Sequence, residues 1–382
     1  MSTVHTPQGG APRASSQANG NDLGIREFAF YDLIIDARSP REYGVDHIPR
    51  AENLPVVNDE EFAEVGTMHR KDKFQAYLIG VTHSLRNMAT WIEDIGSRCD
   101  RSSRILVYCF RGGKRSKLWS DNLRTIGFNV EILPGGWKAY RRWVLASLEI
   151  VTREFDFIVI SGHTGSGKTR LLKALAEEGA QTLDLEGLAR HRGSLIGAIP
   201  GVAQPTQKTF DSLLLERLRS FDTSKPVFIE SESKKVGNIQ LPTALMTAMH
   251  HAAVLRIRVP LEERLRVWRE DFPHFLTNPE LLLSRIEHLR ELLGAKVLKE
   301  WESLASEGKI ETVFEQLMLL HYDPAYKKST PRMFKNWEMH DPIEIQSVEH
   351  QALRGTAKQV IASLSWIFAP EKRPPVSSAT LH

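Results

Sequence analysis

The sequence predicts an α/β protein with a first parallel sheet, a second parallel sheet, and then a helical C-terminal part. Two observations lead to this prediction. Short apolar runs alternate with helically spaced stretches over residues 32–148, and the alternation starts again near residue 154, a pattern typical of parallel sheets covered by helices. From Leu261 onward the spacing is helical and the composition charged. A length of 382 residues is enough for two or three domains.

Strands of the first sheet are predicted from apolar runs that end in polar or glycine-rich sequence. These runs are LIID at 33–36, RILVYCF at 104–110 and VEIL at 130–133. Helices are predicted over 83–99, over 114–128 and after the glycine turn at 135–136. Because open parallel sheets bind ligands at the carboxyl ends of their strands, we expect a site at that edge.

Strands of the second sheet are predicted from runs that end in polar or charged residues. These runs lie at 154–162, 180–186, 225–233 and 252–260. The helical part is predicted over 261–272, 280–308 and 310–322. The predicted organisation is a flexible tail (1–22), a first α/β domain (23–148), a second α/β domain with the helical C-terminal part (153–369) and a second flexible tail (370–382).

The composition excludes several classes of protein. With 41% hydrophobic and 25% charged residues the chain is neither disordered nor fibrous, and its two cysteines exclude a disulfide scaffold or a multi-thiolate zinc site. The net charge of +3 permits a polyanionic partner without requiring one. The polar N-terminal stretch is unlike a signal peptide, and no apolar run has the length of a membrane span. We therefore expect a protein of the reducing cytoplasm.

The first candidate site is the loop in VYCFRGGKRSK, at 107–117. Cys109 ends a predicted strand and precedes two glycines, whose backbone N–H groups can form an anion nest, and the N-terminus of a predicted helix. Positive charge favours the thiolate, so the pKa of Cys109 should be lower than that of a free thiol. The alternative is a buried structural cysteine, and Cys99, outside any such loop, is interpreted as incidental. The candidate catalytic residues are Cys109, Arg111, Gly112, Gly113, Lys114 and Arg115.

The second candidate site is GHTGSGKT at 162–169, which matches the P-loop pattern G-x-x-x-x-G-K-[ST] between a predicted strand and a predicted helix. Backbone N–H groups would wrap a phosphate chain, Lys168 would neutralise it, and Thr169 could bind Mg²⁺. ATP is the default ligand, although any polyphosphate ester could use the loop. His163 is interpreted as a loop filler. The candidate phosphate-binding residues are Gly162, Gly165, Ser166, Gly167, Lys168 and Thr169.

Acidic residues that could complete a metal site follow two of the later strands. Glu230 is the candidate metal ligand beside Thr169, and Glu232 belongs to the same strand end. Asp184 and Glu186 end another predicted strand and are rivals for the same role. Since acidic strand ends are often only solvated termini, the choice among them stays open.

Three segments of the first domain resemble the hallmarks of a rhodanese domain, in the right order over 32–143. They are LIIDARSPREYGVDHIPRAENLPV, VYCFRGGKRS and LPGGWKAYRRW. Rhodaneses carry sulfur as a persulfide on the loop cysteine, which the resemblance places at Cys109. The spacing from Cys109 to Arg115 is one residue longer than in the usual sulfurtransferase loop. It is similar to the loop of rhodanese-like phosphatases and arsenate reductases, which hold a tetrahedral oxyanion.

Together with the P-loop, four further segments resemble the bacterial tRNA 2-selenouridine synthase family over nearly the whole chain between the tails. They are LDLEGLARHRGSLIG, PTQKTFDSLL, VFIESESKKVGNIQLP and LLHYDPAYKKS. The resemblance implies a transferase that replaces the sulfur of wobble 2-thiouridine in tRNA with selenium from selenophosphate. It also implies a geranyltransferase step, in which geranyl diphosphate provides an S-geranyl group that later leaves. Selenophosphate synthetase is a candidate partner.

On this interpretation the Cys109 loop would bind selenophosphate or carry its selenium, and the P-loop could hold the diphosphate of geranyl diphosphate. The candidate tRNA-binding residues are Arg190, His191 and Arg192, because glycines flank them in a predicted loop. The arginines of 256–269 are expected on a solvated helix face, where neighbouring glutamates offset them. Aromatic residues at helical spacing, expected in the core although they could stack on bases, are Trp137, Trp143 and Trp301.

Two other functions stay open. A thiol phosphatase, an arsenate-reductase-like enzyme or a sulfurtransferase with an attached nucleotide-binding regulator would fit the long cysteine loop. A P-loop switch that uses the rhodanese fold only for docking would not need a cysteine surrounded by cations.

Overall fold

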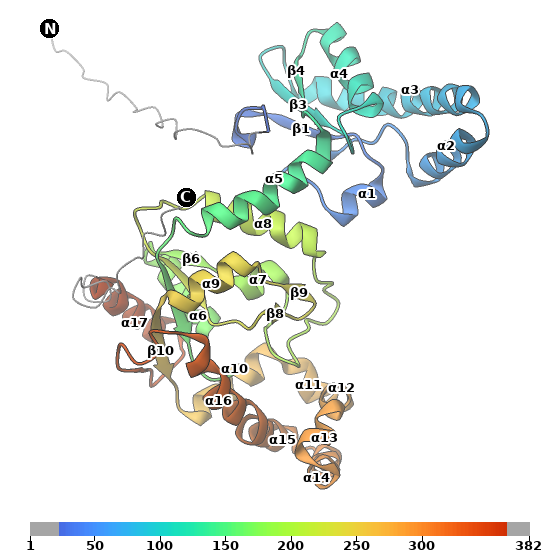
Figure 1. Ribbon diagram of the computed structural model, residues 1–382. Helices are drawn as coiled ribbons and strands as arrows, with labels where there is room; N and C mark the ends of the chain where they lie inside the picture. The colour runs from blue at the N-terminus through green and yellow to red at the C-terminus, as the bar shows by residue number, and fades with distance from the viewer. Residues whose placement is uncertain (1–22, 365–382) are drawn as a thin grey trace, which may run out of the picture. The chain divides into compact units, whose positions relative to one another are not determined.

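The computed structural model describes residues 23–364, and the predicted tails, 1–22 and 370–382, lie outside the described residues (Figure 1). The described chain divides into two compact units. The first comprises residues 23–43 and 50–146, and the second comprises residues 44–49 and 147–364. Each unit contains a parallel sheet, and the C-terminal part of the second is helical, so the predicted fold class is confirmed.

The first unit is built on a four-stranded parallel sheet in the order β2-β1-β3-β4. Its strands are β1 (Leu33–Asp36), β2 (Glu52–Asn53), β3 (Arg104–Tyr108) and β4 (Asn129–Ile132). The helical segments are η1 (Phe28–Phe30), α1 (Pro40–Val45), α2 (Asp59–Lys71), α3 (Lys73–Arg98), α4 (Lys114–Ile126) and α5 (Gly136–Val151). All of β1 and most of β3 are buried, which explains their continuous apolar sequence.

Helix α2 is an element that the sequence prediction missed, and α3 begins ten residues before its predicted start at residue 83. The local signal for α2 was a capping box: the Asn58 side chain accepts a hydrogen bond from the backbone N–H of Glu61, whose carboxylate accepts one from the N–H of Asn58. No residue of α2 is buried, so the helix lacks the apolar stripe on which the prediction relied.

The second unit contains a five-stranded parallel sheet in the order β11-β10-β5-β7-β6. Its strands are β5 (Phe157–Ser161), β6 (Gln181–Leu183), β7 (Val227–Glu230), β10 (Ala253–Arg258) and β11 (Ile343–Glu344). A separate antiparallel pair is formed by β8 (Lys235–Val236) and β9 (Ile239–Gln240). The central strand β5 is buried throughout and lies between β7 and β10, so the loop after β5 lies at the middle of the sheet edge.

Helices surround this sheet and then extend from it. They are α6 (Lys168–Glu177), α7 (Leu185–Ala189), α8 (Gln207–Arg219), α9 (Thr243–His251) and α17 (His350–Ala362). Between β10 and β11 the chain forms a helical group, which Figure 1 shows at one end of the unit in orange and red. The group comprises α10 (Leu261–Asp271), α11 (Pro273–Thr277), α12 (Pro279–Ile286), η2 (Glu287–Leu289), α13 (Arg290–Leu293), α14 (Ala295–Ser306), α15 (Ile310–Leu317), η3 (Met318–Tyr322) and α16 (Asp323–Met333).

The helical group has its own apolar core. Trp268 stacks on Phe314 with ring centroids 4.3 Å apart, and Trp301 is fully buried, where its indole N–H donates to Gln316. Trp301 is therefore a core residue, as its spacing indicated, and Trp137 of the first unit is buried as well. Between residues 23 and 364, no helix is both long enough and apolar enough to cross a bilayer.

Candidate active sites

Cys109 lies directly after β3, between that strand and the N-terminus of α4. Its thiol is almost fully buried. The backbone N–H of Gly113 donates a hydrogen bond to Sγ over 3.2 Å, and Ser116 Oγ lies 3.3 Å from Sγ. The strand therefore delivers the sulfur to a helix N-terminus, where hydrogen-bond donors and the helix dipole favour an anion.

The environment of Cys109 favours the thiolate over the thiol. Burial raises the pKa of this thiol, but hydrogen bonds from Ser116 and from the N–H groups of Arg111 and Gly113 outweigh that effect, and the pKa is lowered. The pKa of Cys99 is raised, chiefly by burial. Ser116, which sequence analysis did not single out, lies one helical turn into α4 and faces the sulfur.

The three cations of the loop have different surroundings. Arg115 forms an ion pair of 2.5 Å with Glu42 of α1 and lies over the Phe62 ring. Lys114 Nζ lies 3.3 Å from the centroid of the Tyr77 ring. Arg111 is exposed. Glu42 thus orients Arg115 while offsetting part of its charge, and an oxyanion bound at the loop would compete with Glu42 for this guanidinium.

A second glycine turn, at 135–136, packs against the backbone of the cysteine loop. Gly112 adopts a φ of +68° and Gly136 a φ of +59°, both in the left-handed region. A Cβ on Gly136 would collide with the carbonyl oxygen of Cys109 and with the backbone of Gly112. The backbone N–H of Trp137 donates to that same Cys109 oxygen over 2.8 Å. The turn at 135–136 is therefore part of the site, although it was absent from the predicted residues.

The P-loop leads from β5 into α6, as its sequence predicts. Gly165 and Gly167 have φ values of +78° and +72°, and a Cβ on Gly162 would meet the Ile257 side chain and Ser166 Oγ at 2.6 Å. Lys168 Nζ donates to the carbonyl of Gly162 over 3.2 Å, so the lysine folds back over the loop. Among residues 23–364, the buried Ser166 Oγ has no hydrogen-bond partner. A phosphate oxygen is an acceptor that such a hydroxyl could serve.

Two glutamates converge on Thr169. Its Oγ1 lies 3.0 Å from Glu186 Oε2 and 3.0 Å from Glu230 Oε2, and the backbone N–H of Glu186 donates to Glu230 over 2.8 Å. A hydroxyl has one proton, so it cannot donate to both carboxylates at once. Burial raises the pKa of both glutamates, and it raises that of neighbouring Glu232 to about 8. Glu232 therefore retains a proton at neutral pH.

These residues fit a hard cation such as Mg²⁺. A threonine hydroxyl and two carboxylates are oxygen donors, and Mg²⁺ usually takes only one or two carboxylates from the protein and the rest of its ligands from phosphates and water. Within the part of the chain that the structure describes, no three His, Cys, Asp or Glu side chains form a metal-binding group by themselves. Asp184, one of the predicted rivals, instead caps α7 by accepting from the N–H of Gly187.

His163 is more than a loop filler. Its Nδ1 lies 3.0 Å from Asp323 Oδ1, and Asp323 also accepts two hydrogen bonds from Arg264, at 2.6 and 3.0 Å. Arg264 Nε donates to the carbonyl of Thr164 in the P-loop. Burial, followed by the charge of Arg264, lowers the pKa of His163 to about 4, so the imidazole is neutral at physiological pH. This network ties the P-loop to α10 and α16.

The predicted tRNA-binding residues lie in a loop beside the acidic cluster. Arg190 is exposed and adopts a φ of +50°, and Arg192 lies over the Phe272 ring. His191 is only 7% exposed, so its imidazole is not available to a phosphate at the surface. A Cβ on Gly193 would meet carboxylate oxygens of Glu186 and Glu232, which places the loop next to the P-loop carboxylates.

The expectation for the arginines of 256–269 is wrong in part. The helix α10 starts only at Leu261, after Pro260, whereas Arg256 and Arg258 belong to strand β10. Both line a pocket, where Arg256 is half-buried and Arg258 stays largely exposed and pairs with Glu344. The glutamates expected to offset these arginines lie on α10, where Glu263 pairs with Arg266.

Comparison with known proteins assigns a family to each unit. Residues 23–142 match the family described as a rhodanese-like domain, and residues 155–283 match the tRNA 2-selenouridine synthase AAA domain. A tRNA 2-selenouridine synthase of Nitrosomonas europaea is 34% identical to this chain, over an alignment that covers 71% of each protein. Those of Marinobacter nauticus (31%, covering 77% and 87%) and of a Sulfurovum species (30%, covering 87% and 94%) are similar over more of their length.

Proposed function

The chain belongs to the tRNA 2-selenouridine synthase family, and from this premise we propose that it is a transferase that exchanges the sulfur of wobble 2-thiouridine in tRNA for selenium. The observation that supports the proposal most is the presence of two separate anion cradles. One surrounds Cys109 and the other is the P-loop, and each lies at the carboxyl end of a strand in its own unit.

The Cys109 loop is proposed to take selenophosphate. The N–H of Gly113 and the Ser116 hydroxyl already hydrogen-bond the sulfur, and Arg111, Lys114 and Arg115 supply positive charge for the phosphate part. A loop with five residues between Cys109 and Arg115 has room for a tetrahedral oxyanion. Selenophosphate synthetase, as the source of this unstable co-substrate, is the protein partner that we propose.

The P-loop is proposed to hold the diphosphate of geranyl diphosphate. Lys168 and the loop N–H groups would balance its charge, and Mg²⁺ bound by Thr169 with Glu186 or Glu230 would stabilise diphosphate as it leaves. The thiocarbonyl sulfur of the base would attack C1 of the geranyl group, and the C–O bond to diphosphate would break. The selenium of selenophosphate would then attack C2 of the base, geranylthiolate would leave as the C–S bond breaks, and water would cleave the P–Se bond to release phosphate.

Arg190 and Arg192 are proposed to contact tRNA phosphates, because they project from a loop beside the P-loop carboxylates. A basic loop at this place would also screen the nucleic-acid backbone from the acidic cluster. His191 is left out of this surface because it is buried.

The test is nucleoside mass spectrometry of thiolated tRNA after incubation with the protein. Geranyl diphosphate alone should convert 2-thiouridine to its S-geranyl form, and addition of selenophosphate should yield 2-selenouridine. Unchanged 2-thiouridine would contradict the proposal. If the protein instead hydrolyses small phosphate esters without tRNA, the thiol phosphatase suggested by the long cysteine loop becomes the better function.

A further inference from the structure

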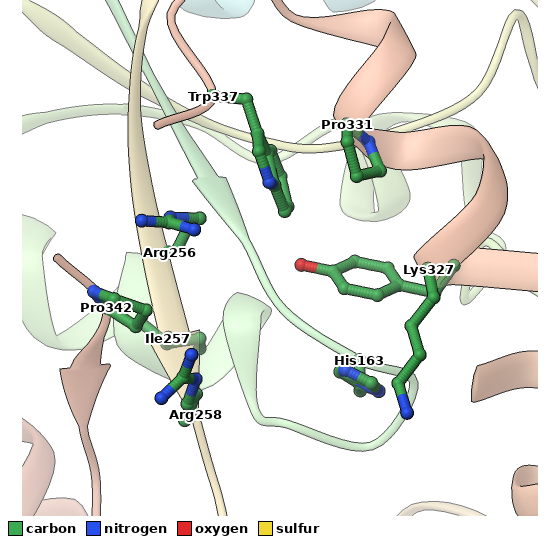
Figure 2. Close-up of a pocket in the computed structure, with 9 residues that line it drawn as sticks. His163, Arg256, Ile257, Arg258, Lys327, Pro331, Trp337 and Pro342 are labelled. Atoms are coloured by element: carbon green, nitrogen blue, oxygen red, sulfur yellow. The ribbon is translucent and has the colours of Figure 1, made fainter. Parts of the chain in front are cut away.

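A pocket of about 290 Å³ adjoins the P-loop in the second unit (Figure 2). It is bordered by β10, by α16 and by the segment between α16 and β11, and His163 connects it with the P-loop. The lining residues that matter here are His163, Arg256, Arg258, Tyr326, Lys327 and Trp337. None of the candidate phosphate-binding residues lines this pocket. Its volume is near the lower end of the range for small-ligand sites and suits a single nucleoside.

Aromatic rings provide flat surfaces inside the pocket. Trp337 and Tyr326 lie with ring centroids 6.0 Å apart at an interplanar angle of 65°, and Tyr326 lies 4.3 Å from the His163 ring. The Tyr326 hydroxyl is 3.1 Å from Ser161 Oγ, which fixes the ring relative to β5. In Figure 2 the Trp337 ring reaches between Arg256 and Pro331. Rings held in this way are suitable for stacking on a planar ligand.

Positive charge accompanies these rings. Arg256, Arg258 and Lys327 all line the pocket, and Arg258, which is largely exposed, also pairs with Glu344 over 3.3 Å. The Arg256 guanidinium lies 5.4 Å from the Trp337 centroid and donates from Nη2 to the carbonyl of His340. Its Nε is buried and has no hydrogen-bond partner among residues 23–364. A guanidinium has five N–H donors and the His340 carbonyl takes only one, so Arg256 can also donate to a ligand in the pocket that it lines.

We propose that this pocket receives the base of the RNA nucleotide to be modified, turned out of its stack. The inference rests on the proposed function, since it takes the substrate to be an RNA. A pyrimidine would stack on Trp337 and meet Tyr326 edge-on, and its carbonyl oxygen would accept from the Arg256 guanidinium. A flanking phosphate would lie near Lys327 and would compete with Glu344 for Arg258. Through His163 the base would lie next to the ligand of the P-loop.

A hydrocarbon chain is the competing occupant, and the observations favour it less. It would contact the rings and prolines, but it would place the half-buried Arg256 guanidinium, which lines the pocket, against apolar surface. The charge of Arg256 therefore favours the RNA base over the apolar part of a prenyl diphosphate.

The test asks whether the contribution of Trp337 to RNA affinity depends on the presence of the wobble base. We would measure the affinity of the full chain for an anticodon stem-loop with 2-thiouridine at the wobble position and for the same RNA with an abasic nucleotide there. Trp337→Ala should weaken binding of the first RNA about tenfold, because stacking on an aromatic ring contributes that order of affinity, and should leave the second unchanged. Trp337→Phe should retain most of the affinity. Phe221→Ala, at a ring that does not line the pocket, should affect neither RNA.

Equal losses on both RNAs, or no loss on either, would overturn the proposal. So would an unchanged RNA affinity combined with weaker binding of geranyl diphosphate, which would assign the pocket to the hydrocarbon chain. If the wild-type protein binds neither RNA, the proposed function fails as well; if it prefers the thiolated RNA and Trp337→Ala keeps that preference, only the pocket assignment fails.

Photocrosslinking of the wild-type protein avoids any effect of substitution on folding. With 5-iodouridine at the wobble position, ultraviolet light should give adducts on Tyr326 or Trp337. Adducts found only in peptides outside residues 323–345 would overturn the assignment.

Discussion

Single residues determine the reactivity of the two cysteines. The pKa of Cys109 is lowered, with burial opposed by the hydrogen bonds of Ser116 and of backbone N–H groups, whereas the pKa of Cys99 is raised by burial. Alkylation by iodoacetamide requires the thiolate, so the rate at Cys109 should reach half its maximum at a lower pH than the rate at Cys99. Peptide mass spectrometry after timed alkylation across pH measures both rates in one sample.

Ser116→Ala removes a hydrogen bond to the thiolate and should move the Cys109 midpoint to higher pH. Ser120→Ala is the matched control, since this buried hydroxyl on the same helix has no partner among residues 23–364. If Cys109 and Cys99 titrate at the same pH, the loop does not activate the thiol.

His163 should make the second unit sensitive to acid. Burial lowers its pKa to about 4, against about 6.5 for a free histidine, so the folded state binds fewer protons than the unfolded state between these values. Stability from this group is therefore lost as pH falls from 6.5 to 4, by about 3 kcal/mol. Urea unfolding of wild type and His163→Gln should show the smaller pH dependence in the variant. His288→Gln, at an exposed histidine, should leave the pH dependence of the unfolding free energy unchanged. If His163→Gln also leaves it unchanged, the account of His163 is contradicted.

Among secondary-structure elements, long apolar strands were predictable and short ones were not. The strands that carry the two candidate loops are buried on both faces, so their sequences are continuous apolar runs. Strands β8, β9 and β11 have two residues each, too few to show a strand pattern. Strand β11 also pairs with β10, which lies far away in the chain, whereas β8 and β9 pair with each other. Arg256 and Arg258 lie in the strand predicted over 252–260, and only the separate expectation of a helix face over 256–269 is wrong for them, because it extended the helical charge spacing back across Pro260.

The two glycine turns of the first unit should differ in their tolerance of substitution. Gly136→Ala forces a left-handed φ on alanine and drives its Cβ into the Cys109 carbonyl, so it should destabilise the first unit by about 2 kcal/mol or more. Gly113→Ala meets open space at a negative φ and should be nearly neutral. Thermal unfolding of both variants tests this difference, and equal melting temperatures would show that the turn does not support the loop.

For the whole molecule, the sequence located both cradles but not the residues that complete them. Cys109 and Lys168 lie in local motifs whose spacing carries the information. Glu42, Asp323 and Trp337 reach the same sites from distant parts of the chain, through contacts that no local pattern encodes. Their identity becomes evident only when the fold brings them to the ends of the strands.

The proposed contact of Arg190 with tRNA phosphates can be tested through the salt dependence of tRNA affinity. Arg190→Ala should weaken tRNA binding and reduce the slope of log affinity against log salt by about 1, as expected when one phosphate contact is lost. Arg290→Ala should change neither, because Glu287 and Glu302 already pair with that guanidinium. Fluorescence anisotropy at several salt concentrations gives both quantities. An unchanged slope for Arg190→Ala would move the RNA surface elsewhere.

The division of labour between the two sites is the central claim, and one matched assay tests it most directly. Lys168→Ala and Cys109→Ser are each given 2-thiouridine tRNA and S-geranyl-2-thiouridine tRNA, with both co-substrates, and the nucleosides are measured by mass spectrometry. Lys168→Ala should fail on thiolated tRNA but selenate the geranylated form, because it lacks only the charge that balances diphosphate. Cys109→Ser should geranylate normally and accumulate the geranylated tRNA. Normal geranylation by Lys168→Ala, or no geranylation by Cys109→Ser, would contradict the claim.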